Sequence, residues 1–381
     1  MTGPSSSSAL LGLVGMLAAF AAPTGCSKFS ETASGDTPDA APEAGTTGGD
    51  AGDAAAERRI YVFGGERIEL LPPAQTLTTA YSAAVAADGT LGKWESALAY
   101  DIDRAEGAFT VQDGIAMFFG GLAGGTPTTQ SAQQATFGST AQASGAAWTE
   151  LLPFKVGRSF ASATGANHAV YLSGGTGTKD VRSGEVDRYD ILGKVWSTPA
   201  TLNEPLAGHA TFIRDGRLYV IGGEKLGKAG ASQTSSAAQI MPDGSLAGWG
   251  TVGVLPVPVA YHGLVRIDPY LFTIGGSAGA AGKTVTSVQR GIFDTSGNLD
   301  WTNFTDVPVP RGQDGLADAC VVTDGTTFYV LGGRKDATSP SVVDVYIGRV
   351  DAAGVVAWSN GPALPEGRAG AGCGISPSSA P

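Results

Sequence analysis

Six pairs of adjacent glycines, each at the end of a hydrophobic stretch, set the strongest constraint on how this chain folds. They are Gly64-Gly65, Gly120-Gly121, Gly174-Gly175, Gly222-Gly223, Gly275-Gly276 and Gly332-Gly333. One tryptophan follows each pair, and these six are all the tryptophans of the chain: Trp94, Trp148, Trp196, Trp249, Trp301 and Trp358. Two independent markers that stay in phase six times predict an internal repeat, and a repeat decides the fold before any other feature does.

Each repeat has the pattern of four short strands. In the third repeat the expected strands are residues 158–164, 169–173, 185–190 and 194–197. Asp-Gly pairs such as Asp88-Gly89 and Asp215-Gly216 lie between expected strands, as in two-residue hairpins whose central residues both need positive φ. One four-stranded unit cannot bury both of its faces, whereas six packed radially can. The sequence therefore predicts an all-β, six-bladed β-propeller of four-stranded antiparallel blades over residues 58–376.

The repeat resembles the kelch repeat, in which a glycine pair ends a hydrophobic strand and a Tyr-Asp, such as Tyr189-Asp190, precedes a tryptophan. The resemblance implies a propeller like the central domain of galactose oxidase. It further implies that the glycines let neighbouring backbones approach closely and that the tryptophans pack between blades. One fold hosts many functions, so function has to be argued from the site.

The two ends of the repeat region are expected to share blade one. A polar segment precedes the first hydrophobic strand, whereas a surplus strand-like segment follows the last tryptophan. We expect residues 368–375 to complete blade one beside Arg59–Phe63, which leaves no open sheet edge at the seam. Cys320 and Cys373 then lie in neighbouring first strands. A disulfide between them would lock the seam, but its geometry is demanding, so two buried free thiols are the preferred expectation.

Residues 1–57 have the sequence pattern of an export signal followed by a tether, and not that of a folded domain. Residues 1–26 contain the apolar run ALLGLVGMLAAFAA, which is too short to span a membrane and is typical of a signal peptide. Small residues before Cys26 resemble a bacterial lipobox, which implies a lipid on Cys26; the alternative is an ordinary signal peptide. Residues 27–57 predict a disordered acidic tether, and residues 377–381 form a tail. We expect an exported protein anchored by lipid at the outer membrane, facing the periplasm or the cell exterior.

Charge narrows the class of partner. The formal net charge is −11, and no cluster of lysine and arginine occurs, which argues against nucleic acid. The expected ligand is a protein or a glycan of the cell envelope or exterior, with the membrane contacted only through the N-terminal lipid. We expect a monomer without a cofactor.

The candidate binding residues lie where the first strands begin, near the longer loops that follow the glycine pairs. When the repeats are aligned, four of them have an arginine at the same position at the start of the first strand. Three residues after this position, two repeats have a histidine and one has an aspartate. The seven candidates are Arg104, Arg158, Arg311, Arg368, His209, His262 and Asp314. The arginines would bind a carboxylate or sugar acid, or form salt bridges, which we favour for at least half of them. Two histidines and an aspartate suit a metal, but histidine is a common strand residue in kelch-like repeats, so no metal is expected.

These patterns predict a non-catalytic scaffold that binds through the loops after the glycine pairs and the loops between blades. No catalytic residue is assigned, because GxSxG, HExxH, a P-loop and sialidase Asp boxes are absent from the sequence. The alternative is a carbohydrate-active enzyme that resembles the mutarotases or oxidases built on kelch-like propellers. Such an enzyme would use a cluster of histidine, arginine and aspartate at the channel mouth.

Overall fold

The computed structural model describes residues 58–376, except 70–73, 98, 100–102, 113, 124–127, 137–147, 226–229, 279–282, 312, 314, 337 and 338. All of them belong to one compact unit, Asp53–Pro381. The expected signal peptide, Cys26, the tether and the tail lie outside the described residues. Within that part of the chain, no helix has the length and apolar character needed to cross a membrane. Its one helix is the 3-10 turn η1 (Thr178–Asp180).

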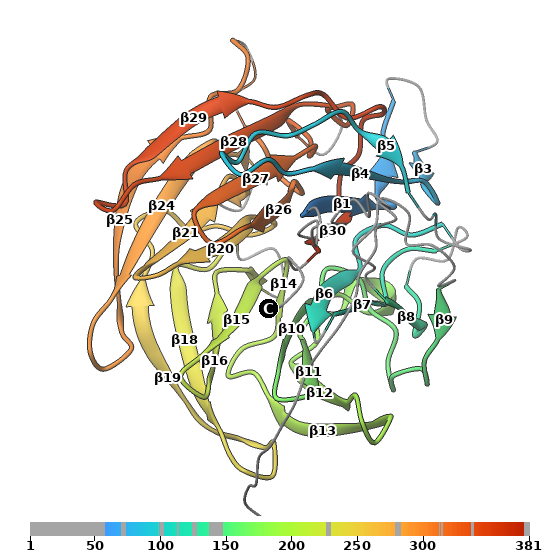
Figure 1. Ribbon diagram of the computed structural model, residues 1–381. Coiled ribbons are helices and arrows are strands. Elements are labelled where there is room, and N and C mark those ends of the chain that lie inside the picture. Colours follow the sequence, from blue (N-terminus) through green and yellow to red (C-terminus); the bar gives the residue numbers. More distant parts are fainter. Residues whose placement is uncertain are drawn as a thin grey trace, which may run out of the picture. The chain divides into compact units, whose positions relative to one another are not determined.

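Six four-stranded antiparallel sheets surround a common centre, which confirms the predicted six-bladed propeller (Figure 1). The innermost strands of blades one to six are β30 (Gly372–Ile375), β6 (Ala108–Gln112), β10 (Ser162–Ala166), β15 (Ala210–Arg214), β20 (Gly263–Ile267) and β26 (Cys320–Thr323). The second strands are β1 (Arg59–Phe63), β7 (Ile115–Phe119), β11 (Ala169–Ser173), β16 (Arg217–Ile221), β21 (Tyr270–Ile274) and β27 (Thr327–Leu331).

The outer half of each blade completes the sheet. The third strands are β4 (Ala80–Ala84), β8 (Ala132–Thr136), β12 (Glu185–Asp190), β18 (Thr234–Ile240), β24 (Ser287–Phe293) and β28 (Val345–Val350). The outermost strands are β5 (Glu95–Ser96), β9 (Thr149–Glu150), β13 (Val195–Thr201), β19 (Leu246–Val254), β25 (Leu299–Asp306) and β29 (Val356–Asn360). Short ribbons pair β2 (Glu66–Arg67) with β3 (Gln75–Thr76), β14 (Leu206–Ala207) with β17 (Glu224–Lys225), and β22 (Ser277–Ala278) with β23 (Lys283–Thr284).

The C-terminal strand closes the ring as the sequence predicts. β30 pairs antiparallel with β1, and Ile375 lies opposite Ile60 while Gly372 lies opposite Phe63. The N–H of Ser376 also donates to the carbonyl oxygen of Arg59 at 2.8 Å. Blade one is therefore built from both ends of the described chain, and β30 covers the inner edge of β1.

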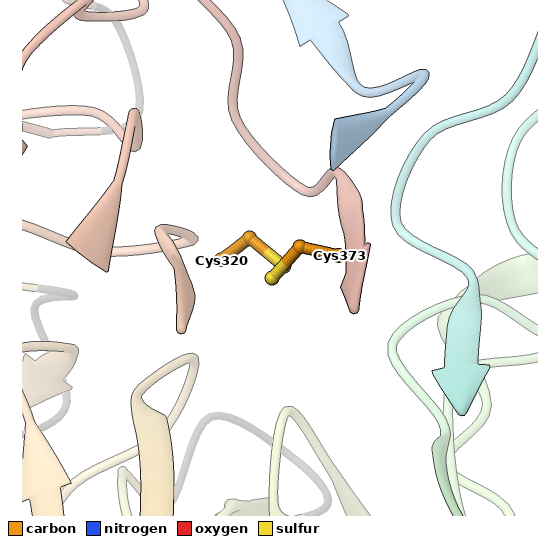
Figure 2. The surroundings of a disulfide bond; sticks show 2 residues. All are labelled: Cys320 and Cys373. Atoms are coloured by element: carbon orange, nitrogen blue, oxygen red, sulfur yellow. A yellow bond between two sulfur atoms is a disulfide. The ribbon is translucent and has the colours of Figure 1, made fainter. Parts of the chain in front are cut away.

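A disulfide crosses the same seam. Cys320 of β26 and Cys373 of β30 are bonded, with their Cα atoms 6.0 Å apart, and Figure 2 shows the two side chains meeting between the strands. The preferred expectation of two free thiols was therefore wrong. The first strands of blades six and one run side by side at the separation that a disulfide requires.

Apolar side chains between neighbouring blades form the core. Six hydrophobic clusters occur in the described residues, one for each pair of neighbouring blades. The tryptophans contribute to this packing, and several indole N–H groups bond to the preceding blade. Trp196 donates to the Leu152 carbonyl and Trp249 to the Thr201 carbonyl, both at 2.8 Å. The predicted role of tryptophan between blades is confirmed.

The glycine pairs join each blade to the next. The N–H of the second glycine donates to a carbonyl at the start of the next blade at 2.6–3.0 Å, as from Gly175 to Leu206. All twelve glycines have positive φ. A Cβ on Gly174 would lie 2.4 Å from the Leu206 carbonyl oxygen, so only glycine permits this close approach.

The Asp-Gly turns follow two different designs. Asp215 and Gly216 both have positive φ, 49° and 70°, as a type I′ hairpin needs. At Asp88-Gly89 and at Asp243-Gly244 only the glycine has positive φ, so the expectation for both residues was wrong there. Instead, the Asp88 carboxylate accepts a hydrogen bond from the N–H of Thr90 at 2.9 Å, an Asx-type turn.

Candidate functional site

Three of the predicted arginines lie inside the blades rather than at the mouth of the channel. The side chains of Arg104, Arg158 and Arg368 are fully buried. Arg158 pairs with Asp187 at 2.5 Å, and Arg368 pairs with Glu366 at 2.9 Å while donating to the Gly64 carbonyl at 2.8 Å. Arg104 donates to the carbonyl oxygen of its own blade's glycine pair at 3.0 Å. These guanidinium groups satisfy buried acceptors and fix the starts of blades one, two and three.

The fourth arginine was assigned to the wrong register. In blade six the carbonyl that accepts from a glycine pair belongs to Leu316, which occupies the position that Arg158 has in blade three. Arg311 lies five residues earlier and is exposed. Asp314 lies outside the described residues, and the position three residues after the register is held by Ala319.

The two histidines lie between blades. His209 Nε2 is 2.8 Å from the Ser173 hydroxyl of blade three, and burial lowers the pKa of His209 to about 3. His262 occupies the same position one blade further on, where burial lowers its pKa to about 4. Neither ring nitrogen of His262 has a hydrogen-bond partner among the described residues, because Ile221 stands where Ser173 stands for His209. In that part of the chain, no three His, Cys, Asp or Glu side chains are grouped to hold a metal ion.

A closed ring of hydrogen bonds surrounds the axis where the first strands begin. One residue from each blade donates its N–H to the carbonyl oxygen of the preceding blade's residue, at 2.7–3.1 Å. We call these residues the axial ring, and in chain order they are Glu106, Phe160, Gly208, Tyr261, Asp318 and Gly370. The ring fixes all six blades relative to one another, so its side chains form a rigid site.

Four members of the axial ring are not glycine, although their backbone conformation is unfavourable for any other residue. All six have φ between 54° and 60°, a left-handed conformation that glycine adopts freely. For other residues it costs about 1–2 kcal/mol each. Gly208 and Gly370 are glycines because neighbours lie over them: an added Cβ would lie 2.5 Å from the Tyr261 ring and 3.0 Å from Glu106, respectively. Strain that persists around one opening indicates that the four side chains serve a function there.

A cavity of about 330 Å³ opens at the ring and continues between the first strands. All six ring residues line it, together with both histidines. One side of the opening is aromatic: the rings of Phe160 and Tyr261 meet edge to face with centroids 5.0 Å apart. The Tyr261 hydroxyl donates to Glu224 at 2.5 Å, and Arg182 pairs with the same carboxylate. Glu224 and Arg182 therefore fix the position of the Tyr261 ring.

The other side of the opening is acidic. Asp318 binds the Arg334 guanidinium at 2.7 Å, while Glu66 and Glu106 lie 3.9 and 4.0 Å from it. Burial raises the pKa of Glu106 to about 8, and the charges of Asp318 and Glu66 act in the same direction. Burial also raises the pKa of Asp318. Three carboxyl groups thus share one guanidinium, and Glu106 keeps its proton at neutral pH. We call Glu66, Glu106, Asp318 and Arg334 the acidic cluster.

Sequence reasoning missed the axial ring, although a signal for it exists. In blades two to five the register residue lies 16 residues before the first glycine of the pair, as Arg158 does before Gly174. Applied to blade six, this spacing selects Leu316 rather than Arg311. The ring residues then follow two positions after the register.

A larger cavity of about 670 Å³ lies among the hairpin turns at the opposite ends of the blades. Three arginines line it, and each has a carboxylate close by. These pairs are Arg188–Asp190, Arg214–Asp215 and Arg266–Asp268, at 3.3, 3.3 and 3.4 Å. Because each arginine of this larger cavity is already paired with a carboxylate, the cavity is the weaker candidate for a ligand site despite its size.

Comparisons with known proteins agree with this architecture. No family model matches the chain. Kelch-like protein terF of Aspergillus terreus is 26% identical over 180 residues, which is 44% of this chain and 38% of that protein. Beta-scruin of Limulus polyphemus is 27% identical over 173 residues, 43% of this chain and 18% of that protein. The chain thus matches well under half the length of either curated relative.

A solved structure, that of YjhT, shares the fold. It superposes with a TM-score of 0.57 and 18% identity, over 71% of this chain and 87% of that chain. At this identity the likeness concerns the fold alone. Together with the repeat itself, these similarities support a β-propeller of the kelch-repeat type.

Proposed function

We propose that this protein is a non-catalytic binding scaffold whose ligand site is the mouth of the channel at the axial ring. The observation that carries the proposal is that four strained, non-glycine side chains surround one cavity. Glycine would fit each backbone position without strain, so the side chains were retained for what they contact. A rigid ring with long loops around it is the arrangement that binding sites use. The partner class is a protein or a glycan of the cell envelope or exterior.

Two features favour binding over the alternative of a carbohydrate-active enzyme. Both histidines on which that alternative depended line the cavity, but Ser173 engages Nε2 of His209. The Tyr261 hydroxyl is committed to Glu224. One observation keeps the alternative testable: a carboxyl group with a raised pKa at a cavity is typical of general acids.

The test compares two glycine substitutions at positive φ. Phe160→Gly removes an aromatic side chain from the mouth, and Asn167→Gly makes the same backbone change at an exposed hairpin turn away from it. Neither substitution should strain the backbone. We expect Asn167→Gly to retain the partners that the full-length protein captures from an envelope extract of its source, and Phe160→Gly to lose them. Equal capture by both variants would refute the proposed site, and turnover on a sugar panel would favour the enzyme.

Export with a lipid anchor at Cys26 is part of the proposal. The Cys320–Cys373 disulfide supports it, because disulfides form and persist in oxidising compartments outside the cytosol. Labelling with a radioactive fatty acid should mark the wild-type protein in the membrane fraction and leave Cys26→Ser unlabelled. Equal labelling of both would exclude Cys26 as the anchor.

A further inference from the structure

We propose that the channel mouth takes a cationic group, a protonated amine or a guanidinium on a short apolar stem, held by Glu106. This inference rests on the binding role proposed above and specifies the chemistry of the ligand.

Glu106 is a mostly buried carboxyl group on the cavity wall, and its side chain makes no hydrogen bond to any other residue that the structure describes. Its side chain is 9% exposed and lines the cavity. Among the described residues its nearest cation is Arg334, with the nitrogen and oxygen 4.0 Å apart, beyond hydrogen-bond distance. The Glu106 side chain is mostly removed from water but is reached from the cavity, so a donor that enters the cavity can pair with it.

The charge around Glu106 selects a donor that is positive. Asp318 receives both the Nε and an Nη of Arg334 at 2.7 Å, so the only cation of the acidic cluster is already engaged. Asp318, Glu66 and Arg334 are the charged groups that act on Glu106, and two of these three are carboxylates. An anionic ligand would be repelled here, whereas a cation would let Glu106 ionise and release its proton.

The opposite wall suits the stem of such a cation. Phe160 and Tyr261 both line the cavity with their rings in contact, and the Tyr261 hydroxyl donates to Glu224. Aromatic faces attract ammonium and guanidinium groups and also cover alkyl stems. A cavity of about 330 Å³ has room for one side chain or a small amine. The cation comes either from a lysine or arginine of a protein partner or from a free amine.

Calorimetry on the full-length protein tests this with four probes. They are an acetylated and amidated Gly-Lys-Gly peptide, its Nε-acetyl-lysine twin, butylamine and glucose. We expect the lysine peptide to bind and the acetyl-lysine twin and glucose not to bind. Butylamine distinguishes a free amine from a protein side chain as the source of the cation. If butylamine binds as well as the peptide, the site accepts free amines; if it binds more weakly, the site recognises lysine within a peptide.

Two glutamine variants assign the binding to Glu106. Glu106→Gln should weaken the lysine peptide about tenfold or more, the loss expected for one charge-assisted hydrogen bond. Glu69→Gln, which changes an exposed glutamate of a loop on the same face, should bind as the wild type does. Binding near neutral pH should also release a proton from the wild type and not from Glu106→Gln, measured in buffers of different ionisation enthalpy.

The outcomes separate this inference from the binding role itself. If the wild type binds no cationic probe but captures a partner that Phe160→Gly loses, the scaffold stands and the cation inference is overturned. Equal affinity of the lysine peptide and its acetylated twin would overturn it too, as would full affinity of Glu106→Gln.

Discussion

The backbone N–H of Glu106 donates to the carbonyl oxygen of Gly370 at 2.8 Å, and this bond closes the axial ring. Gly370 lies just before β30, the strand that reaches blade one from the far end of the chain (Figure 1). The hydrogen-bond ring, the β30–β1 ladder and the disulfide therefore meet at one seam. Stability and site geometry both depend on the last segment of the propeller.

Truncation tests the seam most directly. Removal of residues 367–381 deletes Arg368, Gly370 and β30, which opens an edge of β1 and leaves Glu106 without its ring partner. We expect loss of the cooperative thermal transition or a fall of well over 10 °C in Tm, since several kcal/mol are removed at about 2–4 °C per kcal/mol. Deletion of residues 377–381, beyond the Ser376–Arg59 bond, is the control. An unchanged Tm in the longer truncation would contradict the closure.

The disulfide gives a second prediction. It links residues 53 apart in sequence, and a crosslink of this span typically contributes about 2–4 kcal/mol. We expect a reductant, or the pair Cys320→Ala and Cys373→Ala, to lower Tm by about 5–10 °C. The double variant should then be insensitive to reductant. If reductant lowers the Tm of both proteins equally, the effect does not come from this bond.

His209 and His262 form a natural matched pair, because they hold one position in adjacent blades with different partners. His209→Leu should destabilise by about 1 kcal/mol, since it removes the hydrogen bond with the Ser173 hydroxyl and leaves that hydroxyl only its 3.4 Å bond to the Ser162 carbonyl. His262→Leu should be neutral or stabilising, because it removes two buried nitrogens that have no partner in the described residues. Urea unfolding at pH 7 measures both. Equal losses would show that packing, not hydrogen bonding, governs this position.

The same pair predicts behaviour in acid. Burial lowers the pKa of His262 from 6.5 to about 4, so the unfolded chain takes up a proton at this residue before the folded protein does, and stability falls as the pH drops from 6.5 toward 4. His262→Leu should therefore lose less stability than the wild type between pH 6.5 and 4. Parallel profiles of unfolding free energy against pH would contradict this.

The repeat made the fold predictable, because the glycine pairs and tryptophans report contacts that recur at every blade interface. The closure by residues 368–375 followed from counting strands at the two ends. The disulfide was harder to predict from the sequence. Whether Cys320 and Cys373 bond depends on an interatomic distance, and a repeat pattern fixes only which strands are neighbours.

The site proposed from the structure lies near the channel mouth expected from the sequence, but of the seven predicted residues only His209 and His262 line its cavity. Arginine is long enough to reach inward, so Arg158 in a register near the mouth could either face a ligand or fill a blade, and the partner Asp187 decides the matter. Glu106 and Asp318 escaped notice because neither belongs to a motif. Their roles come from a positive φ and from side chains of other blades, which a single repeat does not reveal.

The buried pair of Arg158 and Asp187 provides a test of the arginines' role. Blade four carries Leu206 and Ser236 at the corresponding positions. Arg158→Leu alone should cost about 3–5 kcal/mol, because it leaves the Asp187 charge buried without a counterion, with only the Thr198 hydroxyl bonded to it. Adding Asp187→Ser, which reproduces the arrangement of blade four, should recover much of that loss. If the single variant unfolds like the wild type, Arg158 does not hold the blade together.

Glu106 itself predicts a stability profile that is independent of any ligand. Its pKa in the folded protein is about 8, raised from an ordinary 4.5. The folded state therefore keeps a proton that the unfolded state has lost, and the stability that depends on this proton disappears as the pH rises from about 4.5 to 8. Glu106→Gln carries no such proton, so its advantage over the wild type should grow across this range, on the order of 4 kcal/mol by pH 8 at about 1.4 kcal/mol per pH unit. Chemical unfolding at pH 5 and pH 8 measures the difference, with Glu69→Gln as the exposed control. Were Glu106→Gln to track the wild type at both pH values, Glu106 would be an ordinary ionised carboxylate, and its place in the mouth would need another explanation.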